Sequence, residues 1–202
     1  MQRTRKDVEV RKVEPLHRGR FRMDRYHMTY RTYAGNWSPE VTREVLDRGH
    51  SVGVLPYDPV TDQVVLIEQF RPGAFVAEDE YPWLWEIVAG IIEDGEAPED
   101  VARRECEEEA GLLPTELLQI GQFYTSAGGT SEYHRLYVGK VNAAAAGGLH
   151  GLIEEVEDIR VFAVPADEAF AAVGDGRIRT APAFAGLLWL QRERDNLRKK
   201  WR

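Results

Sequence analysis

Four glutamates crowd into five consecutive positions of the chain: Glu105, Glu107, Glu108 and Glu109. The surrounding stretch, residues 90 to 112, reads GIIEDGEAPEDVARRECEEEAGL. On a helix, like charges four positions apart destabilise by roughly a few tenths of a kcal/mol per pair. Carboxylates crowded in this way suit a site for a hard divalent cation, since such cations take oxygen ligands.

The residues on either side of the glutamates predict a helix from 98 to 110. Pro98 suits a first helical turn, and Glu99 and Asp100 favour the positive N-terminal end of a helix. Gly111 is a good C-terminal stop. The glutamates therefore lie on a predicted helix of three to four turns.

Three of the glutamates are expected to share one face of this helix. At about 100° per residue, Glu105, Glu108 and Glu109 project together, with Val101 and Leu112 as apolar neighbours. A run of glutamates can simply be an exposed helical face, but the apolar neighbours favour a face turned toward the protein, where carboxylates need a partner. The opposite side is expected to be solvated and carries Asp100, Arg103 and Glu107.

Two neighbours complete the predicted metal site. Arg104 can reach Glu108 at four positions' distance and hold it in place. Gly90 is expected to let the backbone turn, so that the carbonyl of Ala89 approaches the same ions. We predict a site for Mg²⁺, with Mn²⁺ as an alternative, whose ligands are Ala89, Glu105, Glu108 and Glu109.

Composition narrows the class of protein. The chain has 202 residues, 43% of them hydrophobic, which fits a globular protein. Its net charge of −8 argues against nucleic acid as the main partner, because phosphate backbones need a basic face. The single Cys106 rules out a disulfide framework and fits a reducing compartment. With neither an apolar segment of a signal peptide nor a membrane span in the sequence, we expect a cytoplasmic protein.

The order of predicted elements favours an α/β fold with a small N-terminal β domain. Residues 7 to 47 look like about three strands, too few for an independent core, so we divide the chain into 1–49 and 50–202. Residues 71 to 82 and 142 to 158 are expected to be loops. Two C-terminal helices are predicted within 165–178 and 181–201.

Residues 90 to 112 resemble the Nudix box, a pattern of nine constrained positions. The resemblance implies a Nudix α/β/α sandwich, Mg²⁺ bound through the three carboxylates, and hydrolysis of a nucleoside diphosphate linked to another group. Water activated by the cations would attack a phosphorus atom. The residues that fill the pattern are Gly90, Glu96, Arg104, Glu105, Cys106, Glu108, Glu109, Gly111 and Leu112.

Further segments are similar to the bacterial ADP-ribose pyrophosphatases within that family. They read EQFRPGA, PWLWEIVAGIIEDGE, SAGGTSE, HGLIEEVEDIRV and FAGLLWLQRE, and they extend over nearly the whole chain. The resemblance implies hydrolysis of ADP-ribose to AMP and ribose 5-phosphate. It also implies a homodimer in which subunits exchange their N-terminal β segments.

The same resemblance suggests a general base in the stretch GLIEEVED. Glu155 matches the base, with Glu157 close behind; ordinary surface charge is the alternative for this loop. Arg104 belongs to the catalytic set through the box.

Substrate contacts are also implied by the resemblance. Arg43 and Arg71 match positions that hold the substrate, and guanidinium groups suit phosphate oxygens. Glu132 matches a contact on the ribose side. Phe21 matches a residue that stacks on adenine, with a strand-core aromatic as the alternative. The glycines of the substrate loop are Gly128 and Gly129.

Three positions depart from the pattern. Ala127 stands where ADP-ribose enzymes usually carry proline, which leaves the substrate choice open. Ala97 replaces a capping Ser or Thr, a loss of about 1 kcal/mol. Cys106 reads as a small buried hydrophobe and not as a nucleophile. The alternatives are hydrolysis of another nucleotide sugar such as GDP-mannose, or a non-catalytic domain that senses ADP-ribose.

Overall fold

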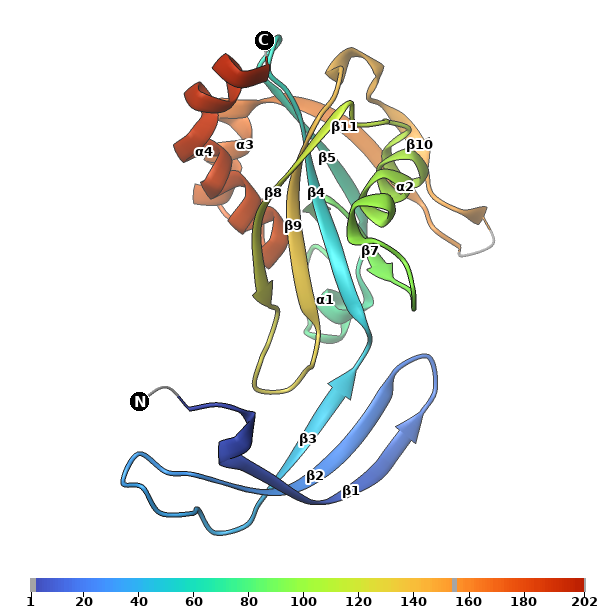
Figure 1. Ribbon diagram of the computed structural model, residues 1–202. Helices are drawn as coiled ribbons and strands as arrows, with labels where there is room; N and C mark the ends of the chain where they lie inside the picture. Colours follow the sequence, from blue (N-terminus) through green and yellow to red (C-terminus); the bar gives the residue numbers. More distant parts are fainter. Residues whose placement is uncertain (1–2, 154–155, 202) are drawn as a thin grey trace. The chain divides into compact units, whose positions relative to one another are not determined.

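The computed structural model describes residues 3–153 and 156–201. The chain divides into two compact units. The first unit consists of Met1–His50 and Tyr124–Tyr133, and the second of Ser51–Phe123 and His134–Arg202. Each unit is described by itself below (Figure 1).

The first unit is a three-stranded antiparallel sheet with little core. Its order is β1-β2-β3, as expected from the alternating aromatic segments. In the described stretch from residue 3 to residue 50, no apolar side chain is fully buried. Such a thin sheet gains little from apolar burial. Its elements are the 3-10 helix η1 (Arg5–Asp7), β1 (Val8–Arg18), β2 (Arg22–Tyr30) and β3 (Val41–Asp47).

A loop from far along the chain joins this sheet through the main chain. The amide of Leu46 donates to the carbonyl of Gly129 at 2.8 Å, and the amide of Ser131 donates to the carbonyl of Leu46 at 3.0 Å. These bonds fix the loop between β8 (Glu116–Tyr124) and β9 (Tyr133–Lys140) to the end of β3. The local sequence does not predict this pairing, because the paired residues lie about eighty positions apart in the chain.

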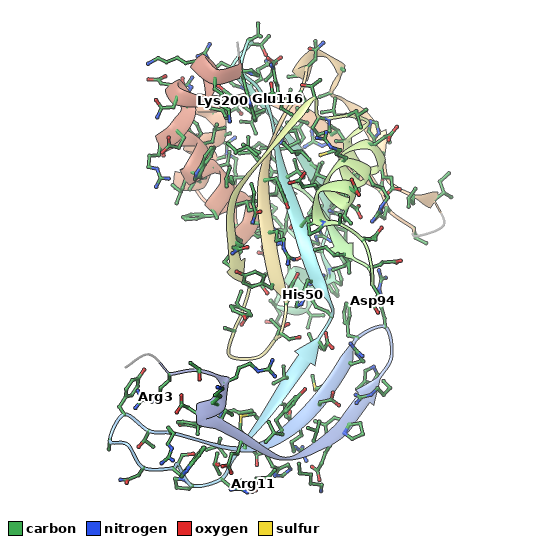
Figure 2. All side chains as sticks on the ribbon, in the orientation of Figure 1. Arg3, Arg11, His50, Asp94, Glu116 and Lys200 are labelled. Carbon is green, nitrogen blue, oxygen red and sulfur yellow. The ribbon has the colours of Figure 1, made fainter. Side chains whose placement is uncertain are left out.

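The second unit is built on a mixed eight-stranded sheet of order β10-β11-β5-β4-β9-β8, with β6 paired to β5 and β7 to β4. Neighbours β4 and β9 run parallel, and β4 and β5 antiparallel. Its strands are β4 (His50–Asp58), β5 (Gln63–Phe70), β6 (Trp83–Glu86), β7 (Val88–Ile92), β8 (Glu116–Tyr124), β9 (Tyr133–Lys140), β10 (Gly148–His150) and β11 (Ile159–Pro165). His50, labelled in Figure 2, marks the start of β4.

Helices cover both faces of this sheet. In Figure 1, α2 (Pro98–Ala110) lies on one side, and α3 (Ala166–Gly174) and α4 (Ala181–Trp201) lie on the other. The alternation of side chains along a strand explains the two cores. On β5, Val64 and Leu66 join the core under α3 and α4, while Val65 and Ile67 join the core under α2. The α/β/α sandwich is therefore confirmed.

Two segments expected to be loops contain regular structure. Residues 71 to 82 include the short helix α1 (Pro72–Val76), which begins with proline at its first position. Residues 142 to 158 include the 3-10 helix η2 (Ala143–Ala145) and strand β10. Both expectations were wrong because α1 and η2 are too short to give a periodic sequence signal, and β10 is defined by its pairing with β11. Among the described residues, no helix is both long and apolar enough to cross a membrane.

Candidate metal and catalytic site

The helix that carries the glutamates spans the predicted residues. It begins at Pro98 and ends at Ala110, and Gly111 follows in the left-handed conformation at φ 63°. Glycine adopts this conformation without the steric cost that a Cβ brings. Ala97 at the N-cap makes no side-chain hydrogen bond, as expected for an alanine. Local sequence signals therefore determined both ends of the helix.

The face of α2 turned toward the sheet includes the expected carboxylates. Glu109 is only 4% exposed, Glu105 and Glu108 are half-buried, and Glu107 is exposed. The expectation that Arg103 is solvated was wrong. It is half-buried because its guanidinium group donates to the carbonyl of Pro114, beyond the helix end.

Gly90 serves a different purpose from the one predicted. It lies inside strand β7 and not in a turn, so the predicted backbone turn was wrong. A Cβ atom built on Gly90 would lie 2.0 Å from Oε1 of Glu105 and 2.1 Å from its Cδ. The absence of a side chain at this position therefore lets the Glu105 carboxylate pack directly against the strand.

Arg104 lies between two carboxylates of its own helix and one that precedes the helix. Its Nη1 is 3.0 Å from Oε1 of Glu105 and donates to Oε2 of Glu108 at 3.0 Å. Its Nη2 is 3.7 Å from Oε1 of Glu96. One guanidinium group thus orients and partly neutralises three carboxylates.

Strand β7 also holds the buried carboxylate. The amide of Ala89 donates to Oε2 of Glu109 at 2.9 Å. Burial raises the pKa of Glu109 well above its ordinary value. The hydrogen bond from Ala89 opposes this effect, and the negative charges of Glu105 and Glu157 add to it. An ionised Glu109 therefore requires a nearby cation.

The pKa of Glu105 is also raised by burial. Burial raises the pKa of Glu105 to about 7; the Arg104 charge acts against this, and the charges of Glu108 and Glu157 add to it. In the described part of the chain, no three His, Cys, Asp or Glu side chains are arranged as a ready-made metal cluster. The donor set nevertheless fits a hard cation, because it consists of carboxylate oxygens that burial disfavours as free ions.

A proton should compete with Mg²⁺ for this carboxylate. Because the pKa of Glu105 is about 7, the group is protonated below that pH, and the cation must displace the proton. We expect Mg²⁺ affinity to fall by about tenfold per pH unit below pH 7 for each displaced proton. Calorimetric Mg²⁺ titrations from about pH 5.5 to about pH 8.5 measure this dependence of the affinity on pH.

The matched control is Glu107→Gln on the exposed side of the same helix. This variant should retain the pH dependence of Mg²⁺ binding. An affinity that is flat with pH in the unmodified chain would contradict the assignment of Glu105 as a ligand.

The predicted base loop is described in part. Glu155 lies outside the described residues. Glu157 is half-buried, and its Oε2 accepts a hydrogen bond from the amide of Leu152 at 3.2 Å. The charge of Glu157 also acts on Glu105 and Glu109, so the loop brings this carboxylate near the face of α2.

Arg71 lies in the same unit as the carboxylate helix. It precedes α1, is half-buried, and its Nε donates to Oε2 of Glu86 at 2.6 Å. Burial raises the pKa of Glu86, and the Arg71 charge opposes that rise. The Arg71 charge also acts on Glu109, so this guanidinium lies within electrostatic reach of the carboxylates.

The other predicted substrate residues belong to the first unit. Arg43 is exposed on β3 and donates to the carbonyl of Thr42 at 2.7 Å. Glu132 is 7% exposed and accepts a bond of 2.9 Å from the hydroxyl of Thr125. The side chain of Glu132 is thereby held in one orientation.

Phe21 lies in the connection between β1 and β2 and not in a strand. It is 38% exposed, and the guanidinium carbon of Arg48 lies 5.5 Å from its ring centroid. The alternative of a strand-core aromatic was therefore wrong. One face of the ring makes a cation–π contact.

Gly128 and Gly129 lie in a turn closed by two bonds to the carbonyl of Ser126. The amides of Gly129 and Thr130 both donate to it at 3.0 Å. Neither glycine has a positive φ, and a Cβ on either would meet nothing within 4 Å. The turn therefore forms with Ala127 in place of proline and leaves open space beside both glycines.

Cys106 is fully buried in the core between α2 and the sheet. Burial raises the pKa of its thiol, and the charges of Glu109 and Glu105 raise it further. A buried thiol of this kind stays protonated and is not a nucleophile. This confirms the interpretation of Cys106 as a small hydrophobe.

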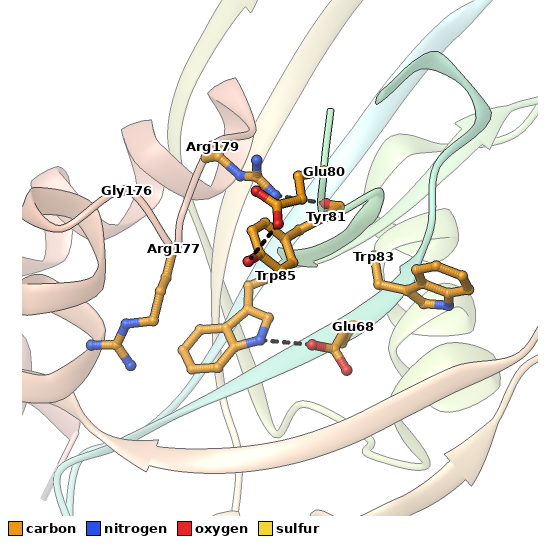
Figure 3. Close-up of a pocket in the computed structure, with 8 residues that line it drawn as sticks. All are labelled: Glu68, Glu80, Tyr81, Trp83, Trp85, Gly176, Arg177 and Arg179. Carbon is orange, nitrogen blue, oxygen red and sulfur yellow. Dashed lines mark hydrogen bonds between the residues drawn. The ribbon is translucent and has the colours of Figure 1, made fainter. Parts of the chain in front are cut away.

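A cavity of about 510 Å³ is lined by residues outside α2, and Figure 3 shows these residues. Trp85 donates from Nε1 to Glu68 at 3.0 Å there, and the guanidinium of Arg177 lies 5.0 Å from the Trp85 ring centroid. No residue of α2 lines it, so it is not the candidate catalytic site. Its lining residues are Glu68, Glu80, Tyr81, Trp83, Trp85, Gly176, Arg177 and Arg179.

Known proteins resemble this chain in sequence. The family model described as NUDIX domain matches residues 47–185. The chain is 47% identical over 195 residues to an ADP-ribose pyrophosphatase of Escherichia coli (strain K12), which covers 96% of this chain and 93% of the relative. An ADP-ribose pyrophosphatase of Haemophilus influenzae is 40% identical over 201 residues, which covers 98% and 93%.

A more distant sequence relative and a solved structure also resemble the chain. A GDP-mannose pyrophosphatase of Cronobacter sakazakii is 36% identical over 149 residues, or 74% of this chain and 77% of the relative. A solved structure described as an ADP compounds hydrolase superposes with a TM-score of 0.72, over 97% of this chain and 98% of that chain. At 18% sequence identity, this last likeness shows the fold alone.

Proposed function

The chain belongs to the NUDIX family, and from that premise we propose that it hydrolyses the diphosphate of ADP-ribose to AMP and ribose 5-phosphate with Mg²⁺. One observation carries the reaction: the carboxylates of Glu105 and Glu109 pack against β7, where Gly90 leaves the space and Ala89 donates a hydrogen bond. The substrate follows from the similar pyrophosphatases, whose likeness covers nearly the whole chain.

Each residue of α2 has a distinct part in the proposed reaction. Glu105, Glu108 and Glu109 would hold the cation, with Mn²⁺ as the alternative, and the carbonyl of Ala89 is the proposed fourth ligand. A bound divalent cation supplies charge neutralisation on the diphosphate and lowers the pKa of the attacking water. Arg104 orients Glu105 and Glu108 through its paired contacts.

The remaining roles concern the water and the substrate. Glu155 is proposed to take a proton from the attacking water, with Glu157 as the second candidate. Arg71 and Arg43 are proposed to bind phosphate oxygens, since guanidinium forks match their geometry. Glu132 is proposed to contact the ribose side, Phe21 to stack on adenine, and the turn of Gly128 and Gly129 to leave room for the substrate.

We also propose that the N-terminal segment 1–49 pairs with a second copy of the chain. On β1, the aliphatic residues Val8, Val10, Val13 and Leu16 are each at least 40% exposed. An exposed apolar row on a sheet without a core favours burial in a symmetric dimer. The buried lone cysteine fits the reducing cytoplasm as the proposed location.

Removal of the N-terminal segment tests the dimer. A chain that begins at His50 should be monomeric or aggregate, and should bind ADP-ribose far more weakly, although every proposed metal ligand remains. Light scattering and the KM for ADP-ribose measure the two effects. A well-folded monomer with unchanged KM would show that the segment contributes neither to assembly nor to the site.

A panel of nucleotide sugars tests the substrate. The replacement of proline by Ala127, together with the GDP-mannose pyrophosphatase among the relatives, makes GDP-mannose the second candidate. With Mg²⁺ and chromatographic separation of products, we expect ADP-ribose to show the highest kcat/KM. A higher value for GDP-mannose would replace the proposed substrate, and tight ADP-ribose binding without turnover would indicate a sensor.

A further inference from the structure

His150, the last residue of β10, lies against the C-terminus of the carboxylate helix. A Cβ atom on Gly111 would lie 2.5 Å from Cε1 of His150 and 3.2 Å from its Nδ1. The imidazole edge therefore fills the space that any side chain at position 111 would need. Asparagine tolerates the left-handed backbone of a helix C-cap, but its Cβ would meet the ring of His150.

Two hydrogen bonds fix this contact. Nε2 of His150 lies 2.9 Å from the carbonyl oxygen of Gly147, and since a carbonyl only accepts, Nε2 carries the hydrogen in this bond. The amide of Gly151 donates to the carbonyl of Glu108 at 3.4 Å, a long bond to a carbonyl in the last turn of α2. Carbonyls there have no partner within the helix.

The contacts continue from His150 to the glutamate-bearing loop. Gly151 has φ 103°, and a Cβ on it would lie 2.6 Å from Cβ of Glu157. Leu152 and Glu157 then close the loop on itself, since the amide of Glu157 donates to the carbonyl of Leu152 at 3.2 Å. A continuous series of close contacts thus leads from Gly111 through His150 and Gly151 to Glu157.

His150 is half-buried and belongs to neither hydrophobic core. Its neighbour Leu149 on the same strand is 73% exposed. The ring therefore packs against the end of α2 at Gly111, directly before the loop that begins at Gly151.

We propose that His150 is a positioning residue for the hydrolysis, whose ring sets the separation between the C-terminal end of α2 and the loop segment that carries Glu157, the second candidate for the base. This inference rests on the proposed function. A base displaced by about 1 Å from its water loses on the order of 10²-fold in rate. In this proposal the ring acts through the loop and not through contact with the substrate.

The test compares His150→Ala with His150→Gln. Glutamine can present its side-chain nitrogen to the carbonyl of Gly147, whereas alanine removes both the ring and the donor. We expect His150→Ala to lower kcat by roughly 10- to 100-fold, with KM and Mg²⁺ affinity within about twofold of the unmodified chain, and His150→Gln to recover most of the loss. The control is Leu149→Ala, which should leave all three values unchanged.

A second variant tests the contact with Gly111 directly. Gly111→Ala forces a Cβ against the ring of His150, so it should lower kcat in the unmodified background. Combined with His150→Ala, it should add far less loss than it causes alone, because coupled residues are not additive. Full additivity of the two losses would overturn the inference.

Hydrogen exchange separates this inference from the proposed function. In His150→Ala, the hydrogen-bonded amides of Gly151, Leu152, Val156 and Glu157 should exchange faster, while those of α2 and β11 stay protected. If the unmodified chain hydrolyses ADP-ribose and His150→Ala keeps both kcat and slow exchange, the inference alone falls. If the unmodified chain does not hydrolyse ADP-ribose, the proposed function falls, and unchanged exchange in the loop would also overturn the His150 contact.

Discussion

Glu109→Gln should remove nearly all hydrolysis of ADP-ribose while the fold stays intact. The change deletes one negative charge from the most buried carboxylate of α2 and leaves an oxygen that can still accept the bond from Ala89. A divalent cation contributes several kcal/mol to stabilisation of the transition state, so a loss of at least about 10³-fold in kcat is expected.

The same change should weaken Mg²⁺ binding but not the metal-free protein. Burial and the charge of Glu105 disfavour an ionised Glu109, so a neutral amide there removes a strain on the fold. The thermal midpoint of metal-free Glu109→Gln should therefore be no lower than that of the unmodified chain. Calorimetry with Mg²⁺ and thermal melts in a chelator measure the two effects.

Glu107→Gln is the matched control, since Glu107 is on the same helix but exposed. It should retain both turnover and Mg²⁺ affinity. Near wild-type activity of Glu109→Gln at saturating Mg²⁺ would contradict the assignment of Glu109 as a metal ligand. An unfolded Glu109→Gln, visible in circular dichroism, would show that the charge serves the fold.

Glu155→Gln should act on turnover alone. Loss of a general base typically lowers kcat by roughly 10²- to 10⁴-fold, and Mg²⁺ affinity and KM should change little because the carboxylates of α2 remain. The measurement is kcat, KM and Mg²⁺ affinity for the variant beside the unmodified chain.

Glu157→Gln distinguishes the two candidates for the base. The Glu157 carboxylate accepts a bond from Leu152, which a glutamine oxygen can also accept, so we expect a smaller loss than for Glu155→Gln. Asp158→Asn, exposed on the same loop, is the control. A larger loss for Glu157→Gln would move the base to that residue.

Local signals in the sequence were enough to predict the helix of the site. The helix ends where its local signals predict: it begins at Pro98, followed by Glu99, and stops before Gly111. Each of these residues favours a helix end through contacts within one turn. The carboxylate face followed from periodicity. Such features depend on neighbours in sequence, which a single chain displays directly.

The close approaches in the site could not be predicted in this way. Gly90 was expected in a turn, because glycine in a sequence often marks one, but it is needed beside Glu105, fifteen positions later. His150 opens the segment HGLIEEVEDIRV, which resembles the bacterial pyrophosphatases, but no role for its ring followed from that resemblance. Its partner Gly111 is explained by helix capping alone until the fold brings the two together.

The division of the chain shows the same limit. The segment Tyr124–Tyr133 joins the first unit through main-chain bonds between Leu46 and two residues of the loop. Backbone bonds of this kind place no demand on side-chain type, so the sequence carries no mark of them. Short elements such as α1 and β10 could not be predicted either, because a segment of three to five residues shows no periodic pattern.

The most direct test is one chromatographic comparison of four reactions. The unmodified chain and Glu109→Gln are each incubated with ADP-ribose, with Mg²⁺ and again with a chelator. We expect AMP and ribose 5-phosphate in equal amounts from the unmodified chain with Mg²⁺, and little product in the other three reactions. Intact ADP-ribose in all four, or equal product with and without Mg²⁺, would contradict a Mg²⁺-dependent ADP-ribose hydrolase built on α2.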